Sequence, residues 1–344
     1  MEDSALFRCQ ELLQKLSARR ELAAEEVHWV FRQMLEGAWS DMETAAILIA
    51  LRMKGETAAE LAAAAEAIRT QMVKVETGRT DVLDTCGTGG DEVGTFNIST
   101  AAAFVAAGAG VPVVKHGNRA VSSRSGSADV LGALGVPIRD GASWPRRCLD
   151  EAGLAFCFAP HFHPALHRVA ALRKRLGVRT IFNCIGPLAN PAGATHQLLG
   201  VGRVELLDPM AGALARLGVR RAFLVCGADG LDEVSLSGTT YVREVFGQTI
   251  TAYVWHPTDF GLEDCAIADL AAAGPEQSAA MIRAVLKGED LPATRVVIAN
   301  AAAALLAAER VSSLQEGVAT AADTVRNGRG EQVLEKLIRL SNHE

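Results

Sequence analysis

A glycine-rich segment between residues 84 and 100 holds the first side chains whose types and spacing could do chemistry. It reads DTCGTGGDEVGTFNIST and lies where a short apolar run gives way to an Ala-rich helix. Glycines at such a turn let backbone N–H groups approach an anion, and the following helix adds its positive end. The dinucleotide-binding motif would need glycine in place of Glu92, and a P-loop would need lysine in place of Thr95.

The glycine-rich segment therefore predicts a phosphate cradle of another kind. Hydroxyl and amide side chains face the same turn, at Thr95, Asn97, Ser99 and Thr100. The alternative is a turn that serves only to begin the helix, with Asn97 or Ser99 as its cap.

A second polar segment, residues 115–129, reads KHGNRAVSSRSGSAD. It contains three Lys or Arg, four Ser, two Gly and one Asn, and it follows the apolar run Val111–Val114. In α/β proteins the carboxyl ends of the strands are where ligands bind. Cations on a flexible Gly- and Ser-rich backbone suit a polyphosphate that must be enclosed, whereas a solvated basic loop is the alternative.

Two further groups of side chains have chemical potential. The adjacent carboxylates Asp232 and Glu233 suit Mg²⁺, although such pairs are usually just solvated. Arg173 lies in a basic stretch on a predicted helix, where a guanidinium could bind a carboxylate through two hydrogen bonds. His161, His163 and His167 include an i, i+4 pair that could mimic a zinc site, but we expect them to line an aromatic pocket or cap a helix.

The elements that must position these residues fall into two parts. Residues 3–75 show helical periodicity only. After Gly78, short apolar runs alternate with Ala- and Leu-rich helices, and from about Gly274 the chain returns to helix, with Pro275 and Pro292 in first helical turns. The expected strands are 82–83, 111–114, 155–158, 198–201, 222–225 and 249–255.

This alternation predicts an α/β protein with a mostly parallel central sheet and a smaller all-helical domain. We place the helical domain at residues 1–75, joined in space by part of 165–190, and the α/β domain at 76–344.

Composition excludes several classes of protein. The 344 residues carry 34 Lys or Arg against 40 Asp or Glu, a net charge of −6, without basic blocks, so we expect no nucleic-acid partner. The longest uncharged apolar stretch, 101–114, has 14 residues, and a membrane span needs about 20. The acidic N-terminus does not resemble a secretory signal. Seven scattered cysteines suit a reducing compartment, and we expect a cytoplasmic protein.

Several separated motifs, in order from about residue 80 to 240, closely resemble the anthranilate phosphoribosyltransferase family. They are GTGGD (87–91), FNIST (96–100), residues 115–129, FAPHFHP (158–164), LGVRTIFN (176–183), GPLANP (186–191) and DEVS (232–235). The resemblance implies a helical domain plus an α/β domain, a homodimer through the helical domains, and two Mg²⁺ ions per subunit. It also implies transfer of a 5-phosphoribosyl group from phosphoribosyl pyrophosphate (PRPP) to the amine of anthranilate, releasing pyrophosphate, in tryptophan biosynthesis.

The resemblance carries specific residues. It implies PRPP contacts by Gly87, Gly90, Asp91, Thr95, Asn97, Ile98, Ser99, Thr100, Lys115, His116, Gly117, Asn118, Arg119, Ala120, Val121, Ser122, Ser123 and Ser127. It implies anthranilate contacts by Gly87, His116, Asn118 and Arg173, the last three as catalytic residues, and magnesium ligation by Ser99, Asp232 and Glu233.

Three other functions remain open at this point. A pyrimidine-nucleoside phosphorylase has a related fold, but its uncharged base gives Arg173 no carboxylate to bind. A PRPP-dependent enzyme could use another aromatic amine. A non-catalytic relative that binds phosphorylated or nucleic-acid ligands should have lost Asp232 and Glu233 or part of KHGNR, and neither is lost.

Overall fold

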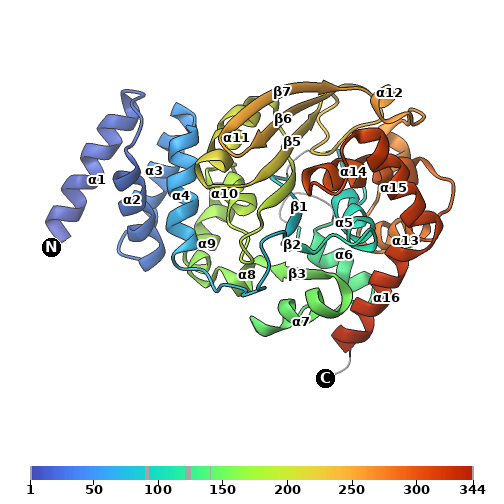
Figure 1. The fold of residues 1–344 in the computed structure, drawn as a ribbon. Coiled ribbons are helices and arrows are strands. Elements are labelled where there is room, and N and C mark those ends of the chain that lie inside the picture. Colours follow the sequence, from blue (N-terminus) through green and yellow to red (C-terminus); the bar gives the residue numbers. More distant parts are fainter. Residues whose placement is uncertain (1, 90–92, 121–124, 140, 343–344) are drawn as a thin grey trace.

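The computed structural model describes residues 2–89, 93–120, 125–139 and 141–342 (Figure 1). In the first part of the chain four helices form a bundle, with bounds α1 Glu2–Ser17, α2 Ala24–Glu36, α3 Asp41–Lys54 and α4 Ala58–Arg69. Thr57 caps α4, because its hydroxyl accepts the Glu60 N–H while the Glu60 carboxylate accepts the Thr57 N–H. Glu60 also accepts the Leu22 N–H and, at 2.8 Å, the Lys54 ammonium, and thereby ties three segments of the bundle together.

The rest of the chain builds a seven-stranded sheet of order β3-β2-β1-β4-β5-β6-β7. The strands are β1 Leu83–Gly87, β2 Val113–Gly117, β3 Leu154–Phe158, β4 His196–Gly200, β5 Arg221–Gly227, β6 Thr240–Phe246 and β7 Thr249–Trp255. Strands β1 to β5 pair in parallel, while β6 and β7 pair antiparallel, so the predicted mostly parallel sheet is confirmed. The sequence analysis missed β6, whose ladder with β7 forms a hairpin at the edge of the sheet.

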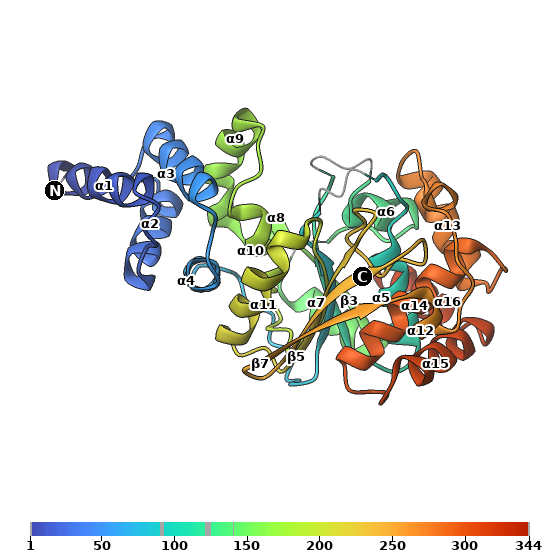
Figure 2. The same cartoon turned by 90° about the horizontal axis from the view of Figure 1, so that it is seen from above.

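Helices cover both faces of the sheet (Figures 1 and 2). Between strands or before the last strands lie α5 Ile98–Gly108, α6 Ser127–Ala133, α7 Ser143–Ala152, α8 Ala159–Phe162, α9 His167–Leu176, α10 Phe182–Leu188 and α11 Leu207–Arg216. After β7 follow α12 Pro257–Phe260, α13 Pro275–Leu286, α14 Pro292–Ala307, α15 Leu314–Arg326 and α16 Arg329–Asn342. Pro275 and Pro292 are the first residues of α13 and α14, as predicted.

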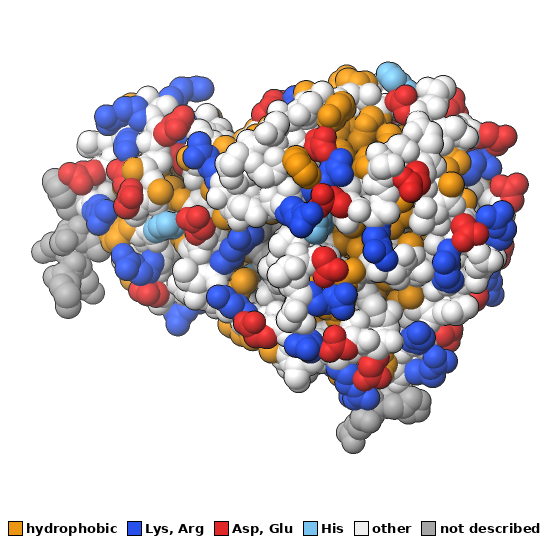
Figure 3. Space-filling model, in the orientation of Figure 1, with side chains coloured by type: hydrophobic (Ala, Val, Ile, Leu, Met, Phe, Trp, Pro, Cys, Tyr) orange, Lys and Arg blue, Asp and Glu red, His pale blue; other side chains and the backbone are white. Residues whose placement is uncertain are grey.

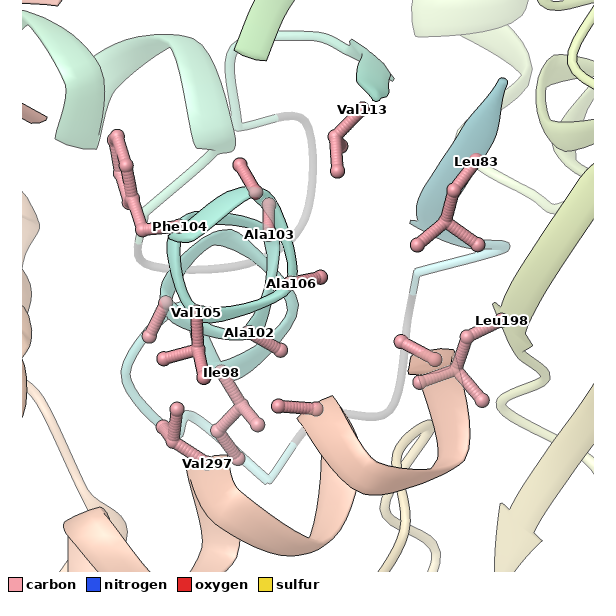
Figure 4. Close-up of a cluster of buried hydrophobic side chains, with 14 of the residues drawn as sticks. Leu83, Ile98, Ala102, Ala103, Phe104, Val105, Ala106, Val113, Leu198 and Val297 are labelled. Carbon is pink, nitrogen blue, oxygen red and sulfur yellow. The ribbon is translucent and has the colours of Figure 1, made fainter. Parts of the chain in front are cut away.

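One face of the sheet packs against α5 and α14. Leu83 and Val113 point from the strands toward the small side chains of α5, Leu198 lies beside α14, and Val297 of α14 lies next to Ile98 of α5 (Figure 4). Every residue from Val296 to Leu306 of α14 is buried, as expected for a helix that is apolar all round.

The opposite face of the sheet shares a core with the helical bundle. Side chains alternate between the two faces along a strand, so the neighbours of the residues that face α5 and α14 point the other way. Leu199 and Leu224 are such neighbours, and they pack with α10 and α11. The same core contains Leu48 of α3 and Leu61 of α4. Helices α9 and α10, from segment 165–190, contact α2, α3 and α4, so they lie between the bundle and the sheet (Figure 2).

The surface is ordinary for a protein of mixed charge. On the face shown in Figure 3, Lys and Arg side chains are interspersed with Asp and Glu. Within the described ranges, no helix has both the length and the apolar character needed to cross a membrane.

Candidate active site

Two pockets adjoin at the carboxyl ends of β1 and β2. We call the first, of about 210 Å³, the apolar pocket and the second, of about 230 Å³, the polar pocket. Both are lined by Cys86 and Gly87 of β1 and by His116, Gly117 and Asn118 at the end of β2. These five residues therefore form a shared wall, where a molecule in one pocket meets a molecule in the other.

The polar pocket combines a helix N-terminus with cations and hydroxyls. Besides the shared wall it is lined by Gly89, Gly94, Thr95, Phe96, Asn97, Ile98, Ser99, Lys115, Ser125, Ser127, Asp232 and Glu233. Helix α5 begins at this pocket, and its dipole adds positive potential, while the Ile98 and Ser99 N–H groups are bonded to Phe96 O and to Glu233. The Lys115 ammonium donates to Thr85 O and to Ser99 Oγ, which directs its charge toward this end of α5. This chemistry suits a polyphosphate.

The carboxylates Asp232 and Glu233 are held against the polar pocket by backbone donors. Gly89 N–H donates to Asp232 Oδ2 at 3.2 Å, and Ser99 N–H donates to Glu233 Oε1 at 3.0 Å. The loop that carries them approaches β4 so closely that a Cβ on Gly200 would lie 1.7 Å from Asp232 O. Only glycine fits at position 200, a requirement that the sequence analysis did not identify.

The donor set at this edge fits Mg²⁺. Among the described residues no group of three His, Cys, Asp or Glu could enclose a metal ion. Mg²⁺ does not require such a cage, because it is commonly held by one or two carboxylates together with substrate phosphates and water. Asp232, Glu233 and the Ser99 hydroxyl, all on the polar pocket, could supply those protein ligands.

Among the described residues, Arg173 is the one cation that lines the apolar pocket. Its lining includes Ile68, Leu166, Phe182 and Ile185, together with His163 and Arg173. The Arg173 guanidinium lies 5.0 Å from the centre of the Phe182 ring, and Phe182 in turn packs 5.4 Å from Phe31 of α2. Burial lowers the pKa of Arg173, which still remains charged at neutral pH. Within the described part of the chain no carboxylate forms an ion pair with Arg173. Its guanidinium can therefore pair with the carboxylate of a bound ligand.

His116 is a neutral hydrogen-bonding group in the shared wall. Its Nδ1 lies 3.0 Å from Gly186 O, so Nδ1 carries the proton and Nε2 is the acceptor. Nε2 is buried and has no hydrogen-bond partner among the described residues. The His163 ring is 5.0 Å away. Burial, assisted by the neighbouring His163, lowers the pKa of His116 to about 3.

The structure brings most of the predicted site residues together. Among the described ones, Gly87, Thr95, Asn97, Ile98, Ser99, Lys115, His116, Gly117, Asn118, Ser127, Asp232 and Glu233 line the polar pocket, and Arg173 lines the apolar pocket. Gly90, Asp91, Val121, Ser122 and Ser123 lie outside the described residues.

Three predicted residues line neither pocket. Thr100 is 1% exposed within α5, Arg119 pairs with Asp129 at the surface, and the Ala120 N–H also donates to Asp129. Asp129 thus organises the backbone beside the site. The sequence analysis also missed Cys86, Phe182 and Asn183, although the last two lie inside the LGVRTIFN motif.

Comparison with known proteins agrees with this geometry. Residues 10–72 match the model of the glycosyl transferase family, helical bundle domain, and residues 79–331 match that of the glycosyl transferase family, a/b domain. The chain is 46% identical over 326 residues to the anthranilate phosphoribosyltransferase of Herpetosiphon aurantiacus, covering 94% of this chain and 96% of that one. The chain belongs to the anthranilate phosphoribosyltransferase family.

Solved structures of this family superpose over nearly the whole chain. The anthranilate phosphoribosyltransferase of Thermus thermophilus matches with a TM-score of 0.91 and 43% identity, covering 96% of this chain and 99% of that one. The Saccharomyces cerevisiae enzyme in complex with PRPP and Mg matches with a TM-score of 0.88 and 29% identity, covering 97% and 98%. The same yeast enzyme in complex with 4-fluoroanthranilate gives a TM-score of 0.86 at 27% identity, covering 99% of both chains.

The buried histidines predict a pH dependence of stability. Burial lowers the pKa of His163 to about 4, so between pH 6.5 and 4 the unfolded chain binds a proton that the folded chain does not. The free energy of unfolding should therefore fall as the pH is lowered through this window, by about 2–3 kcal/mol from His163 alone. We expect His163→Phe to reduce this fall, as measured by urea unfolding at pH 7, 5.5 and 4. Parallel profiles for the two proteins would contradict a neutral His163.

Proposed function

We propose that the two pockets transfer the 5-phosphoribosyl group of PRPP to the amine of anthranilate, giving N-(5-phosphoribosyl)anthranilate and pyrophosphate in tryptophan biosynthesis. The observation that carries this function is the shared wall of Cys86, Gly87 and His116–Asn118. A polar pocket suited to a polyphosphate and an apolar pocket with one guanidinium meet at this wall. The anomeric carbon of one substrate and the aromatic amine of the other can therefore meet at this wall while each substrate stays in its own pocket.

The polar pocket would hold the pyrophosphate end of PRPP. Lys115 and the positive end of the α5 dipole would stabilise the negative charge that increases on the leaving group as the bond to the anomeric carbon breaks. Mg²⁺, when bound through Asp232, Glu233 and Ser99, would supply further charge neutralisation on phosphate oxygens. We propose two ions per subunit, which two adjacent carboxylates and a polyphosphate with several oxygens can accommodate.

The apolar pocket would orient anthranilate by its two substituents. Arg173 binds the carboxylate, and the acceptor nitrogen Nε2 of His116 accepts a hydrogen bond from the amine. Asn118, in the same wall, contacts both substrates. An aromatic amine is already neutral at pH 7, so positioning by these three residues suffices and no dedicated general base is assigned.

Two alternatives differ in the acceptor. A pyrimidine-nucleoside phosphorylase would bind an uncharged base, and the half-buried guanidinium of Arg173 would then lack an anion. Another aromatic amine could replace anthranilate only if it also carried an anionic group within reach of Arg173.

We also propose that the protein is a cytoplasmic homodimer assembled through the helical bundle. Met42 and Met53 are 75% and 70% exposed on α3, and their spacing of three helical turns places them on one face. All seven cysteines are free and buried, which suits a reducing compartment.

The reaction is tested by mixing the purified protein with anthranilate, PRPP and Mg²⁺ and following the loss of anthranilate fluorescence. We expect a loss that requires PRPP, and release of pyrophosphate in equal amount. If PRPP raises the melting temperature in the presence of Mg²⁺ but anthranilate is not consumed, the donor assignment stands and the acceptor assignment is wrong.

Replacing Arg173 tests the orientation of the acceptor. We expect Arg173→Ala to raise the KM for anthranilate by at least about 30-fold, because the carboxylate loses a partly buried charged hydrogen-bond partner worth about 2 kcal/mol or more. The KM for PRPP should change less than about 3-fold. Arg175→Ala, which removes an exposed guanidinium from the same helix, is the matched control. Equal increases in both KM values would instead indicate a structural role for Arg173.

The carboxylates are tested by Asp232→Asn together with Glu233→Gln. Turnover should fall by at least about 100-fold, since an electrostatic contribution to the leaving group is lost. The remaining activity should no longer increase with Mg²⁺ concentration. A normal Mg²⁺ titration with normal turnover would remove both residues from the metal site.

A further inference from the structure

The parallel ladder between β1 and β2 stops early. Pairing between these strands joins only Leu83 with Val113, with the Leu83 N–H donating to Pro112 O at 2.9 Å. In contrast, β1 pairs with β4 over five residues, from Leu83 to Gly87, and β2 pairs with β3 over five, from Val113 to Gly117. The two strands therefore separate toward their carboxyl ends, which is where the two pockets meet.

Regular parallel geometry identifies the two rungs that are missing. If the ladder continued, Thr85 would donate to Val114 O and would accept the His116 N–H, because a residue bonds to both neighbours of its partner. These backbone groups are buried and must be paired in some other way.

Three side chains pair three of the four backbone groups of these rungs, namely the His116 N–H, Thr85 O and Val114 O. Asp84 Oδ1 accepts the His116 N–H at 3.1 Å, and the Lys115 ammonium donates to Thr85 O. The Asn190 amide donates both to Val114 O at 2.8 Å and to Asp84 Oδ2 at 2.7 Å. We call Asp84, Lys115 and Asn190 the side-chain wedge. It satisfies backbone atoms of both strands while holding the strands apart.

The wedge lies directly beneath the shared wall. Asp84 is three residues before Gly87 on β1, and its acceptor atom holds the backbone of His116 on β2. Asn190 follows α10, whose Gly186 O receives the His116 ring. The position of His116 is thus set from two sides, through its backbone N–H by the wedge and through its ring by α10.

The chemistry of Asp84 fits this task. Its carboxylate is fully buried, and burial raises its pKa to about 6, opposed by Lys115, the Asn190 amide and the His116 N–H. A carboxylate can accept from both donors at once, whereas an amide of the same shape would place its own N–H group against one of them. Besides Lys115, the thiols of Cys86 and Cys157 are the titratable groups that interact with it.

We propose that Asp84 and Asn190 are positioning residues that set the gap between the ends of β1 and β2, and thereby the approach of the anomeric carbon to the acceptor nitrogen. This inference rests on the proposed phosphoribosyl transfer, because it assigns the gap to the point where the two substrates react. Lys115 and Arg173, which hold the charged ends of the two substrates, keep their contacts with Ser99 and Phe182 when Asp84 or Asn190 is replaced. The effect should therefore fall on kcat much more than on either KM.

Asn190→Ala tests the proposal with wild-type enzyme and Thr324→Val alongside. We expect kcat to fall at least about 10-fold, with both KM values and the number of PRPP sites per chain, from calorimetry, within about 3-fold of wild type. Thr324 is fully buried in α15, where its hydroxyl donates to Thr320 O. Thr324→Val therefore removes a buried hydrogen bond away from the site and serves as the control. Asp84→Asn preserves the side-chain volume and should likewise lower kcat with little change in either KM. It replaces Asn190→Ala in the test if that variant does not fold.

Hydrogen exchange supplies a readout that does not depend on the reaction. Backbone amides of residues 113–117 should exchange faster than in wild type in Asp84→Asn and Asn190→Ala. Their exchange rates should not change in Thr324→Val, because only the wedge variants release the His116 N–H. An unchanged kcat with unchanged exchange would overturn the proposal. So would a fall in kcat that matches a fall in PRPP sites, which would indicate simple loss of folded enzyme. A wild-type enzyme that releases no pyrophosphate would overturn the proposed function while leaving the exchange result to decide the wedge.

Discussion

The separation of β1 and β2 is the constraint on which the rest of the site depends. Paired strands lie about 4.8 Å apart, and a ladder continued to Gly87 would bring the two strand ends together beneath the shared wall. Because the strands separate, helix α5 can present its N-terminus on one side of the gap and α10 can present its apolar side chains on the other. The polar and apolar pockets meet above one interrupted ladder, and the polar groups that fill the interruption come from the strands themselves and from the loop after α10.

Electrostatics separates the two pockets as clearly as geometry does. Lys115 lies on the polar side and Arg173 on the apolar side, while the histidines between them are held neutral by burial. A charged imidazole at the wall would attract either anionic substrate, and the two pockets would then discriminate less between the two substrates. Neutral His116 keeps hydrogen-bonding capacity at the meeting point without adding charge.

The sequence predicted the fold class, most strands and most of the residues that line the pockets, for identifiable reasons. The glycine turn and residues 115–129 are contiguous, so each can be assigned from local chemistry before its three-dimensional position is known. Strand β6 was missed because Arg243 and Glu244 stand in the middle of its sequence, TYVREVF, and interrupt the apolar run. Asp84 was missed because its role depends on a gap between strands, and a single carboxylate within an apolar run gives no sign of a missing rung. Thr100 was assigned to the site by its motif, but its side chain is buried within α5 and lines neither pocket.

The core shared by the helical bundle and one face of the sheet has a consequence for how the chain divides. The family models separate near residues 72 and 79, but Leu48 and Leu61 of the bundle belong to the same apolar cluster as Leu199 and Leu224 of the sheet. A cut at that boundary would expose apolar surface on both fragments. The bundle is therefore a covering layer of the sheet as much as a domain, and we regard the whole chain as the smallest piece that can fold as a unit.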